Sequence, residues 1–409
     1  MVSLRPVDEE ALEAFTRADL AAFGESSLNR QRFALDWTHI ELDRTMAAFS
    51  GSDIVATGRC YTLELTLPGD TIVPTAAVSW IAVLPTHRRQ GLLTAVMARL
   101  LDQAEERGEA LAVLLASEGV IYRRFGFGVA TSSMSARLDR RHAGFLLPTT
   151  GAPRVRLIDE AAARTVLPPV FDRARRTEPG AVERVEAWWP GELFFPDPNE
   201  EGNKFFAVHD PEGDGEPDGY VVYRVISAWA DGVHKGRLVV DDLVSTTDAA
   251  REALWRYVCG VDLVETIEIA SSPVDDPLRW MLAESRRLQP ARVSDGLWVR
   301  ILDTAQALEA RRYAVADRLV VDVVDPNGRR GAAGRFAVEG GPDGAHATRT
   351  TAEPDLVLDV ADLGAALLGG VTFSTLARAR LVEERSPGAL ARADVLFRCE
   401  PLPYTSTWF

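Results

Sequence analysis

One segment, Ala77-Val78-Ser79-Trp80-Ile81-Ala82-Val83-Leu84-Pro85-Thr86-His87-Arg88-Arg89-Gln90-Gly91-Leu92-Leu93, carries the clearest structural pattern in this sequence. Its first seven residues are rich in β-formers and predict a strand. From Gly91 to about Arg107, apolar side chains recur on one helical face, and Gly108 ends that helix. Leu111–Leu115 then forms another buried strand. Strand, loop, helix and strand in this order predict a crossover that joins two parallel strands.

The residues before this segment predict a helix followed by an antiparallel meander. Apolar side chains recur at helical spacing between Val7 and Phe23. Turn clusters at Ser50–Asp53 and Pro68–Asp70 flank the run Tyr61–Thr66, in which apolar and polar residues alternate as in a half-buried strand. The first part of the chain is therefore predicted to form a mixed sheet with helices.

The same pattern returns in the middle of the chain. Leu238–Val244 predicts a strand, Ala249–Cys259 a helix and Thr266–Ile269 a second strand. This second unit follows a linker at Pro148–Pro153 and contains a turn-rich insert at Gly213–Gly219. The repetition predicts an internal duplication.

The last part of the chain has a different pattern. It contains a strand-like run at Leu319–Val324, the hairpin signal Pro326-Asn327-Gly328, a second run at Leu356–Val360 and a short helix at Ala361–Leu368. These features predict a separate α+β domain at the C-terminal end.

Length and charge limit the classes of protein to consider. A chain of 409 residues contains two to four domains at about 100–200 residues per domain, and three fits the patterns above. The formal charge of −15 disfavours nucleic acid and anionic membrane as main partners and favours a cationic substrate. Many proteins are acidic only because negative charge keeps them soluble, and this also explains the charge of −15. The charge therefore does not distinguish a cationic substrate from simple solubility.

The remaining composition points to an intracellular protein without a metal. Cys60, Cys259 and Cys399 are odd in number and lack the spacing of metal ligands, so they are predicted to be reduced thiols. No run approaches the ~18 apolar residues of a spanning helix, and the N-terminus lacks the features of a signal peptide. The histidines have no spacing suited to zinc, and His87 is interpreted as structural. We therefore expect a cytoplasmic protein.

The loop between the first strand and helix suits a phosphate group. A helix N-terminus presents unpaired N–H groups and the positive end of the helix dipole. Gly91 allows close approach of the backbone, and Arg88 and Arg89 add positive charge. A plain turn has the same sequence features, so the loop alone does not distinguish the two interpretations.

A tyrosine is expected in the same cleft. Tyr122 lies in Ile121–Phe127, which follows the second parallel strand and its loop, Ala116–Gly119. Ligands of parallel sheets bind at the carboxyl ends of the strands, where both the tyrosine and the phosphate loop occur. The sequence therefore predicts one shared site.

These motifs together resemble a known superfamily. Arg-Arg-x-Gly-x at 88–92 with Tyr-x-x-x-Gly-Phe at 122–127 is similar to the GNAT N-acetyltransferases, which bind acetyl-coenzyme A (acetyl-CoA). At the sixth position of the loop this sequence has Leu93, where the superfamily has glycine or alanine. The resemblance implies an acetyltransferase site in the first third of the chain.

Resemblance to one branch covers the whole chain. Val83–Arg89, Ala116–Gly119, Ala391–Asp394 and Thr407–Phe409 are similar to the actinobacterial Eis acetyltransferases. That branch implies an α/β and α+β protein of two tandem GNAT-like domains and a sterol-carrier-protein-like domain. The expected limits are 1–147 for the catalytic domain, 148–290 for a degenerate GNAT-like domain and 291–409 for the third. The branch also implies a homohexamer.

The resemblance implies a role for each part of the site. Tyr122, with a reference pKa near ~10, would be the general acid, and the terminal carboxylate of Phe409 the general base. The acetyl-CoA site would comprise strand, loop and helix residues: Ile81, Ala82, Val83, Arg88, Arg89, Gln90, Gly91, Leu92, Leu93, Thr94, Ser117 and Glu118. The amine acceptor site would comprise aromatic, acidic and polar residues: Phe23, Glu25, Trp37, Ser79 and Trp80.

The expected reaction is acetylation of primary amines of cationic small molecules, such as aminoglycosides or polyamines, at one or several positions. Acetylation of lysine side chains in peptides is one alternative, and a non-catalytic lipid-binding role of the third domain is another. In the second domain, the loop Ser245–Asp248 has neither glycine nor arginine, and Asp248 would repel phosphate. That domain is therefore not expected to bind coenzyme A.

Overall fold

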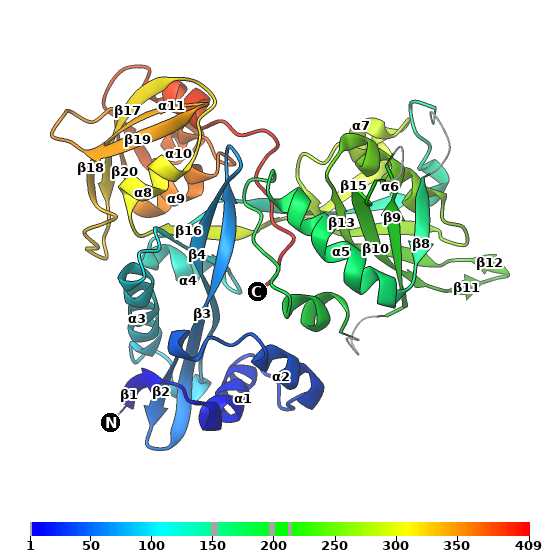
Figure 1. Ribbon diagram of the computed structural model, residues 1–409, viewed down its shortest axis with the longest axis horizontal. Coiled ribbons are helices and arrows are strands. Elements are labelled where there is room, and N and C mark those ends of the chain that lie inside the picture. The colour runs from blue at the N-terminus through cyan, green and yellow to red at the C-terminus, as the bar shows by residue number, and fades with distance from the viewer. Residues whose placement is uncertain (1, 149–153, 196–200, 212–214) are drawn as a thin grey trace.

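The computed structural model describes residues 2–148, 154–195, 201–211 and 215–409. The expected linker at 148–153, apart from Pro148, and residues 213 and 214 of the expected insert at 213–219 lie outside these residues. Three sheets, each with its own helices, form three domains arranged around the C-terminal end of the chain (Figure 1).

The first sheet has seven strands in the order β1-β2-β3-β4-β5-β16-β6. Its strands β2, β3 and β4 form the expected antiparallel meander, and β4 pairs with β5 in parallel, as the crossover predicts. The strands are β1 Val2–Pro6, β2 Thr45–Ser50, β3 Asp53–Leu67, β4 Thr71–Val83, β5 Leu111–Leu115, β6 Phe127–Val129 and β16 Leu297–Ile301. The helices are α1 Leu12–Ala22, α2 Arg30–Trp37, α3 Leu92–Glu106 and α4 Gly119–Tyr122.

The second sheet repeats this architecture. Its order, read from the opposite end, is β8-β9-β10-β13-β14-β7-β15, and β13 and β14 form the parallel pair. The expected duplication is confirmed by this matching order. The strands are β7 Ser132–Asp139, β8 Val155–Ile158, β9 Asn203–His209, β10 Gly219–Ile226, β13 Arg237–Ser245, β14 Thr266–Pro273 and β15 Leu288–Asp295. The helices are α5 Glu160–Arg175, α6 Asp248–Gly260 and α7 Leu278–Met281, and β11 Trp229–Ala230 with β12 Val233–His234 forms a separate hairpin.

The two sheets exchange strands. After β6 the chain enters the second sheet as β7, and after β15 it returns to the first sheet as β16, which lies between β5 and β6. The strands of the two sheets are therefore not separated by the expected domain limits at residues 147 and 290. β7 lies before residue 147 but belongs to the second sheet, and β16 lies after residue 290 but belongs to the first. Because each sheet contains a strand from the other side of such a boundary, the two domains depend on each other for complete sheets.

The third domain has a five-stranded sheet in the order β19-β18-β17-β20-β21. The expected strands and short helix are present, and the hairpin signal at 326–328 lies between β17 and β18. The strands are β17 Asp317–Val324, β18 Gly334–Gly341, β19 Gly344–Arg349, β20 Leu356–Asp359 and β21 Val382–Glu384. The helices are α8 Thr304–Ala310, α9 Val360–Leu367, α10 Phe373–Arg378 and α11 Ala389–Phe397.

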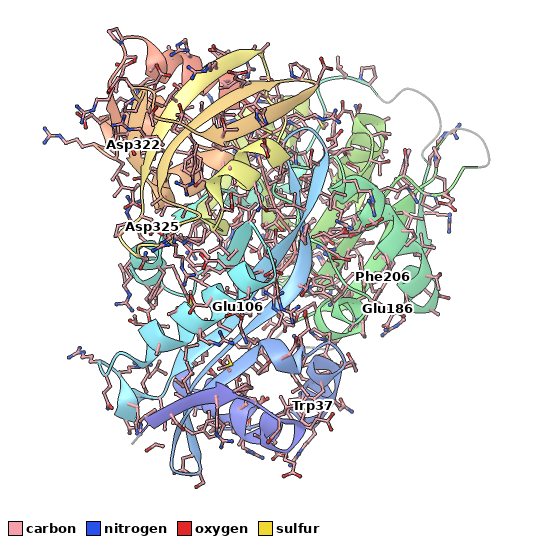
Figure 2. All side chains as sticks on the ribbon, turned by 60° about the vertical axis from the view of Figure 1, so that its left-hand side comes forward. Trp37, Glu106, Glu186, Phe206, Asp322 and Asp325 are labelled. Carbon is pink, nitrogen blue, oxygen red and sulfur yellow. The ribbon has the colours of Figure 1, made fainter. Side chains whose placement is uncertain are left out.

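The third domain is packed firmly against the first. Apolar residues of β3, β5 and β16 share one core with those of β17, β20 and α9. Arg300 on β16 pairs with Asp325 at 2.5 Å, and both side chains are fully buried. Asp325 lies where the third domain meets α3 (Figure 2), and nearby Arg329 pairs with Asp102 and Glu105 of that helix. Apolar packing and these ion pairs thus join the third domain to β16 and α3 of the first domain.

Candidate active site

Strands β4 and β5 separate soon after they meet. Their ladder joins only Ala76 to Ala112 and Ala77 to Val113, although β4 continues to Val83. The β3–β4 register slips by one residue at the same level, and Trp80 there has φ 52°. A non-glycine residue in this region marks a bulge held by its surroundings. The bulge opens a gap between two parallel strands at their carboxyl ends.

The loop after β4 and the start of α3 form one end of this gap. Arg89 and Gly91 both have positive φ, at 62° and 80°. Gly91 is the N-cap of α3 and supplies no side-chain cap, so the first amide groups of the helix have no capping partner. Arg88 and Arg89 lie beside them. A 15-residue helix with an uncapped N-terminus and two arginines is an electrostatic match for a pyrophosphate.

A groove of about 740 Å³ runs from this loop to the strand gap. It contains every residue expected to bind acetyl-CoA except Gln90, which is not part of the lining. Six further residues line it that sequence reasoning did not assign to the coenzyme: Ala22, Phe23, His87, Ile121, Tyr122 and Arg124. Arg124 lies within the motif at 122–127, two residues after Tyr122, and adds a third positive charge that its place in the motif could have indicated.

Tyr122 lies at the junction of this groove and a second cavity. It ends α4, is 5% exposed and lines both spaces. Burial raises the pKa of Tyr122 above its usual value, and a hydrogen bond with the Ser117 side chain partly offsets this rise. The phenol is therefore protonated at neutral pH and able to donate a proton.

The C-terminal residues reach the same second cavity from the other direction. Trp408 and Phe409 line it together with Tyr122, although 286 residues lie between Tyr122 and Phe409 in the sequence. The Thr407 hydroxyl donates to the carbonyl of Val182 at 2.7 Å. The two residues expected to carry catalysis are thus brought into one cavity.

This second cavity, of about 240 Å³, contains three of the five residues expected to bind the acceptor: Phe23, Ser79 and Trp80. Glu25 is exposed and lies outside the lining. Trp37 also lies outside it, because its ring packs against Phe33 and the core beneath α1. Figure 2 shows Trp37 on α2, at the opposite end of the molecule from the third domain.

Acidic side chains that sequence reasoning missed line the acceptor cavity. They are Asp19, Asp36, Glu183 and Glu192. Burial raises the pKa of Asp19 to about 6, and the charge of Arg59 partly offsets this rise. Burial also raises the pKa of Glu192, which pairs with Arg32. Because Glu183 and Glu192 belong to the segment before β9, no pattern in the first third of the sequence could have indicated them.

One buried cation lies among these carboxylates. Arg59 on β3 is 2% exposed, and its guanidinium lies 3.9 Å from the ring centroid of Trp80 and 4.4 Å from that of Tyr61. Burial lowers the pKa of Arg59 to about 9, with Asp36 and Asp19 acting in the opposite direction. The side chain stays charged at neutral pH and fixes the Trp80 ring at the bulge.

The second sheet has the equivalent helix but a different N-terminus. Thr247 caps α6 by accepting a hydrogen bond from the Ala250 amide at 3.1 Å, and Asp248 begins the helix. The amide of Thr246 donates to the carbonyl of Asp218. In this copy a side-chain cap and a carboxylate thus lie at the helix end where a phosphate would bind. That the second domain does not bind coenzyme A stays a prediction.

Among residues 2–148, 154–195, 201–211 and 215–409, no group of three or more His, Cys, Asp or Glu side chains is placed to hold a metal ion. In the same part of the chain, no helix combines the length and the apolar character needed to cross a membrane. Cys60, Cys259 and Cys399 are all unpaired thiols.

Comparison with known proteins agrees with the three domains. Residues 3–130 and residues 180–301 each match a family described as acetyltransferase (GNAT) domain, and residues 304–406 match the sterol carrier protein domain. An uncharacterized N-acetyltransferase of Streptomyces avermitilis is 37% identical over 100% of this chain and 99% of its own.

Relatives with a more specific name also match most or all of this chain. N-acetyltransferase Eis of Mycobacterium tuberculosis is 36% identical over 85% of this chain and 84% of its own length. The crystal structure of Eis1 from Mycobacterium abscessus superposes with a TM-score of 0.89 at 36% identity, covering all of both chains. The uncapped helix, the strand gap and these whole-length similarities lead to one assignment: the chain belongs to the Eis family of GNAT N-acetyltransferases, enzymes that use acetyl-CoA.

Proposed function

We propose that this enzyme transfers the acetyl group of acetyl-CoA to primary amines of polycationic small molecules, with aminoglycosides and polyamines as the substrate classes. The observation that carries the proposal is the acceptor cavity, where Tyr122 and Phe409 lie among four carboxylates beside the coenzyme groove. Carboxylates attract a compound with several ammonium groups, and the net charge of −15 adds long-range attraction. An acceptor with several amines can bind in several orientations, which allows acetylation at more than one position.

In this proposal acetyl-CoA lies along the groove. The amides at the start of α3, with Arg88, Arg89 and Arg124, hold the pyrophosphate. The backbone of β4 from Ile81 to Val83, which has no ladder partner in β5, pairs with the pantetheine arm and polarises the thioester carbonyl. The thioester then lies at the bulge, next to the acceptor cavity.

The chemical step uses one group from each side of the cavity. The carboxylate of Phe409, directly or through a water, takes a proton from the acceptor ammonium. The freed amine attacks the thioester carbonyl, so a C–N bond forms and the C–S bond breaks. Tyr122 gives its proton to the leaving thiolate. The phenol has this proton at neutral pH because burial raises its pKa. The products are an acetamide and free coenzyme A.

The acceptor is held by rings and carboxylates. Phe23 and Trp80 supply apolar and cation–π contact, and Ser79 a hydroxyl. Asp19, Asp36, Glu183 and Glu192 supply the negative charge that the expected Glu25 would have provided. Arg32, which pairs with Asp36 and Glu192, neutralises part of it. We further propose a cytoplasmic homohexamer on the basis of the resemblance; a light-scattering mass equal to one chain would contradict the hexamer.

The first test is thiol release from acetyl-CoA in the presence of an aminoglycoside, comparing the wild type with Tyr122→Phe. We expect a loss of ~10²-fold or more in the variant, because the phenol is the proposed proton donor. Tyr313→Phe is the matched control, since Tyr313 is equally buried but donates to the carbonyl of Leu308 in the third-domain core. Equal rates for wild type and Tyr122→Phe would remove the tyrosine from the mechanism.

Two alternatives are separated by the same assay. Lysine peptides offered in place of aminoglycosides test protein acetylation, and turnover of peptides alone would replace the small-molecule acceptor. A lipid-binding role predicts no turnover with any amine and lipid recovered by organic extraction. The apolar faces of β17, β20 and α9 already pack in the core shared with the first domain, which argues against a lipid tunnel there.

A further inference from the structure

We propose that the second GNAT-like domain uses its former coenzyme cleft to hold the C-terminal tail, residues 402–409, and that Arg184 is the positioning residue for the Phe409 carboxylate. The inference rests on the proposed role of that carboxylate as the base. It gives a function to the second domain, in which Thr247 caps α6 and Asp248 begins it, at the place where the first domain has its phosphate loop.

The cleft survives in the backbone of the second sheet. Strands β13 and β14 pair in parallel only from Arg237 to Val240 and then separate, as β4 and β5 do. The β10–β13 register slips by one residue between Val222 and Tyr223, so the bulge is also present on the equivalent strand. The gap beyond this bulge holds a segment of protein.

The tail enters that gap and contacts β14 directly. The hydroxyls of Tyr404 and Ser271, which lies on β14, are 2.9 Å apart. The amide of Tyr404 donates to the carbonyl of Pro179 at 2.9 Å. Figure 1 shows the tail leaving the third domain, passing between the other two and ending near the centre of the molecule. Tyr404 itself is buried, so the contact excludes water.

Arg184 links the other side of the gap to the tail. Its Nη1 donates to Asp242 of β13 at 2.6 Å, and its Nη2 donates to the Ser406 hydroxyl at 2.9 Å and to the Ser406 carbonyl at 3.2 Å. Tyr220 donates to the same carboxylate at 2.8 Å. The guanidinium lies 4.0 Å from the ring centroid of Phe171. Because the guanidinium is planar and held from three directions, the position of Ser406 is fixed by the second domain.

The distance from this anchor to the proposed base is short. Three residues follow Ser406, and at 3.3–3.6 Å per residue they extend at most about 11 Å. Two of them are tied down: Thr407 by its hydrogen bond to Val182, and Trp408 by a 2.6 Å bond from the Trp188 indole to its carbonyl. A shift of Ser406 therefore moves the Phe409 carboxylate directly.

The test is a double-mutant cycle on the full chain. Arg184→Lys keeps a positive charge beside Asp242 but loses the fork that reaches Ser406. The second background carries two extra residues after Phe409, which converts the base into an amide. We expect Arg184→Lys to lower kcat at least 10-fold in the native chain, with KM for acetyl-CoA unchanged, and to have no further effect in the extended chain. The loss should shrink as pH rises toward the pKa of the acceptor amine, which then needs no base.

A second readout does not depend on catalysis. Carboxypeptidase A releases an accessible C-terminal phenylalanine, and intact-mass spectrometry follows that release. Arg184→Lys should speed the release of Phe409 at least 5-fold. Arg44→Lys is the matched control, because Arg44 and Glu109 form a buried pair with the same side-chain exposure, 1% and 5%, as Arg184 and Asp242. The control should leave the release rate unchanged.

Each outcome decides the proposal. Equal losses in the native and extended chains, or an unchanged release rate, would overturn the role of Arg184. If release accelerates but the extended chain keeps full kcat, Arg184 anchors the tail and the base role of Phe409 fails instead. The two failures are therefore distinguishable.

Discussion

The two GNAT-like sheets place the same strand gap and the same bulge in front of helices of opposite chemistry. In the first copy α3 begins at Gly91 with no side-chain cap and has arginines beside it. In the second, Thr247 caps α6 and Asp248 occupies its first position. The backbone topology survived duplication while the surface that would meet a phosphate did not. A shared fold therefore says little about ligand binding, which a few residues at one helix end determine.

The contents of the two gaps differ as well. The first gap opens onto a groove and a cavity, whereas the second is occupied by Tyr404 and its neighbours. The two domains therefore divide one task, since the first carries the coenzyme groove and the second holds the segment that ends in the proposed base. Four perturbations test this division.

The largest effect is expected when the tail is lengthened. Adding residues after Phe409 turns its carboxylate into an amide, so turnover should fall by about 10²–10⁴-fold, the usual contribution of a general base. Steady-state thiol release measures this fall. The same residues added at the N-terminus serve as the control, and undiminished turnover of the C-terminally extended chain would exclude the terminal carboxylate.

The next effect comes from transferring the helix start of the second copy into the first. Leu92→Asp places a carboxylate where Asp248 lies in α6, so the affinity for acetyl-CoA should fall about 10–100-fold by repulsion. The helix itself should gain about 0.3–1 kcal/mol, because an acid favours the first turn. Isothermal titration and thermal melting measure the two quantities.

The matched control for this transfer is Leu92→Asn, which keeps the shape without the charge. It should retain most of the affinity. If Leu92→Asn weakens acetyl-CoA as much as Leu92→Asp does, sterics rather than charge distinguish the two helices. The reciprocal Asp248→Leu should not create binding, because the Thr247 cap remains.

A smaller effect concerns pH in the acceptor cavity. The pKa of Asp19 is raised to about 6, so this carboxyl is ionised above that pH and protonated below it. The KM for a polyamine should therefore rise about 3–10-fold as pH falls from 7 to 5, at an effective Coulomb attraction of roughly 1 kcal/mol. Asp19→Asn should make KM nearly independent of pH over this range, whereas Glu10→Gln, at an exposed position, should leave the rise in KM unchanged. An unchanged rise in Asp19→Asn would assign the pH dependence to another group.

The smallest effect is on the stability of the second domain. Burial raises the pKa of Glu178 from 4.5 to about 7, with Arg251 partly offsetting this rise. The native state holds this proton where the unfolded chain has lost it, so stability falls as pH rises from 4.5 to about 7. Glu178→Gln should reduce this pH-dependent loss of unfolding free energy by about 1–2 kcal/mol. This value is smaller than about 1.4 kcal/mol for each unit of the pKa shift, because solvent screens part of the effect. Urea unfolding at pH 5 and pH 8 checks this, and an unchanged pH dependence would contradict it.

Local patterns determined a large part of the fold and of the coenzyme groove. The alternation and helical spacing from Ala77 to Leu115 predict the crossover, and the arginines with Gly91 predict the phosphate loop. These features were readable because each depends on residues close together in the chain. A helix end, its glycine and its arginines occupy one continuous segment.

The acceptor cavity and the exchanged strands were decided by tertiary structure. Asp19 and Arg59 come from α1 and β3, while Glu183, Trp188 and Trp408 come from beyond residue 180. No periodicity brings such residues together, because long-range packing places them. The strand order that puts β16 into the first sheet and the path of the tail past Arg184 are decided in the same way. The sequence alone determines which residue types can bind and react, whereas only the packed chain determines which of them meet.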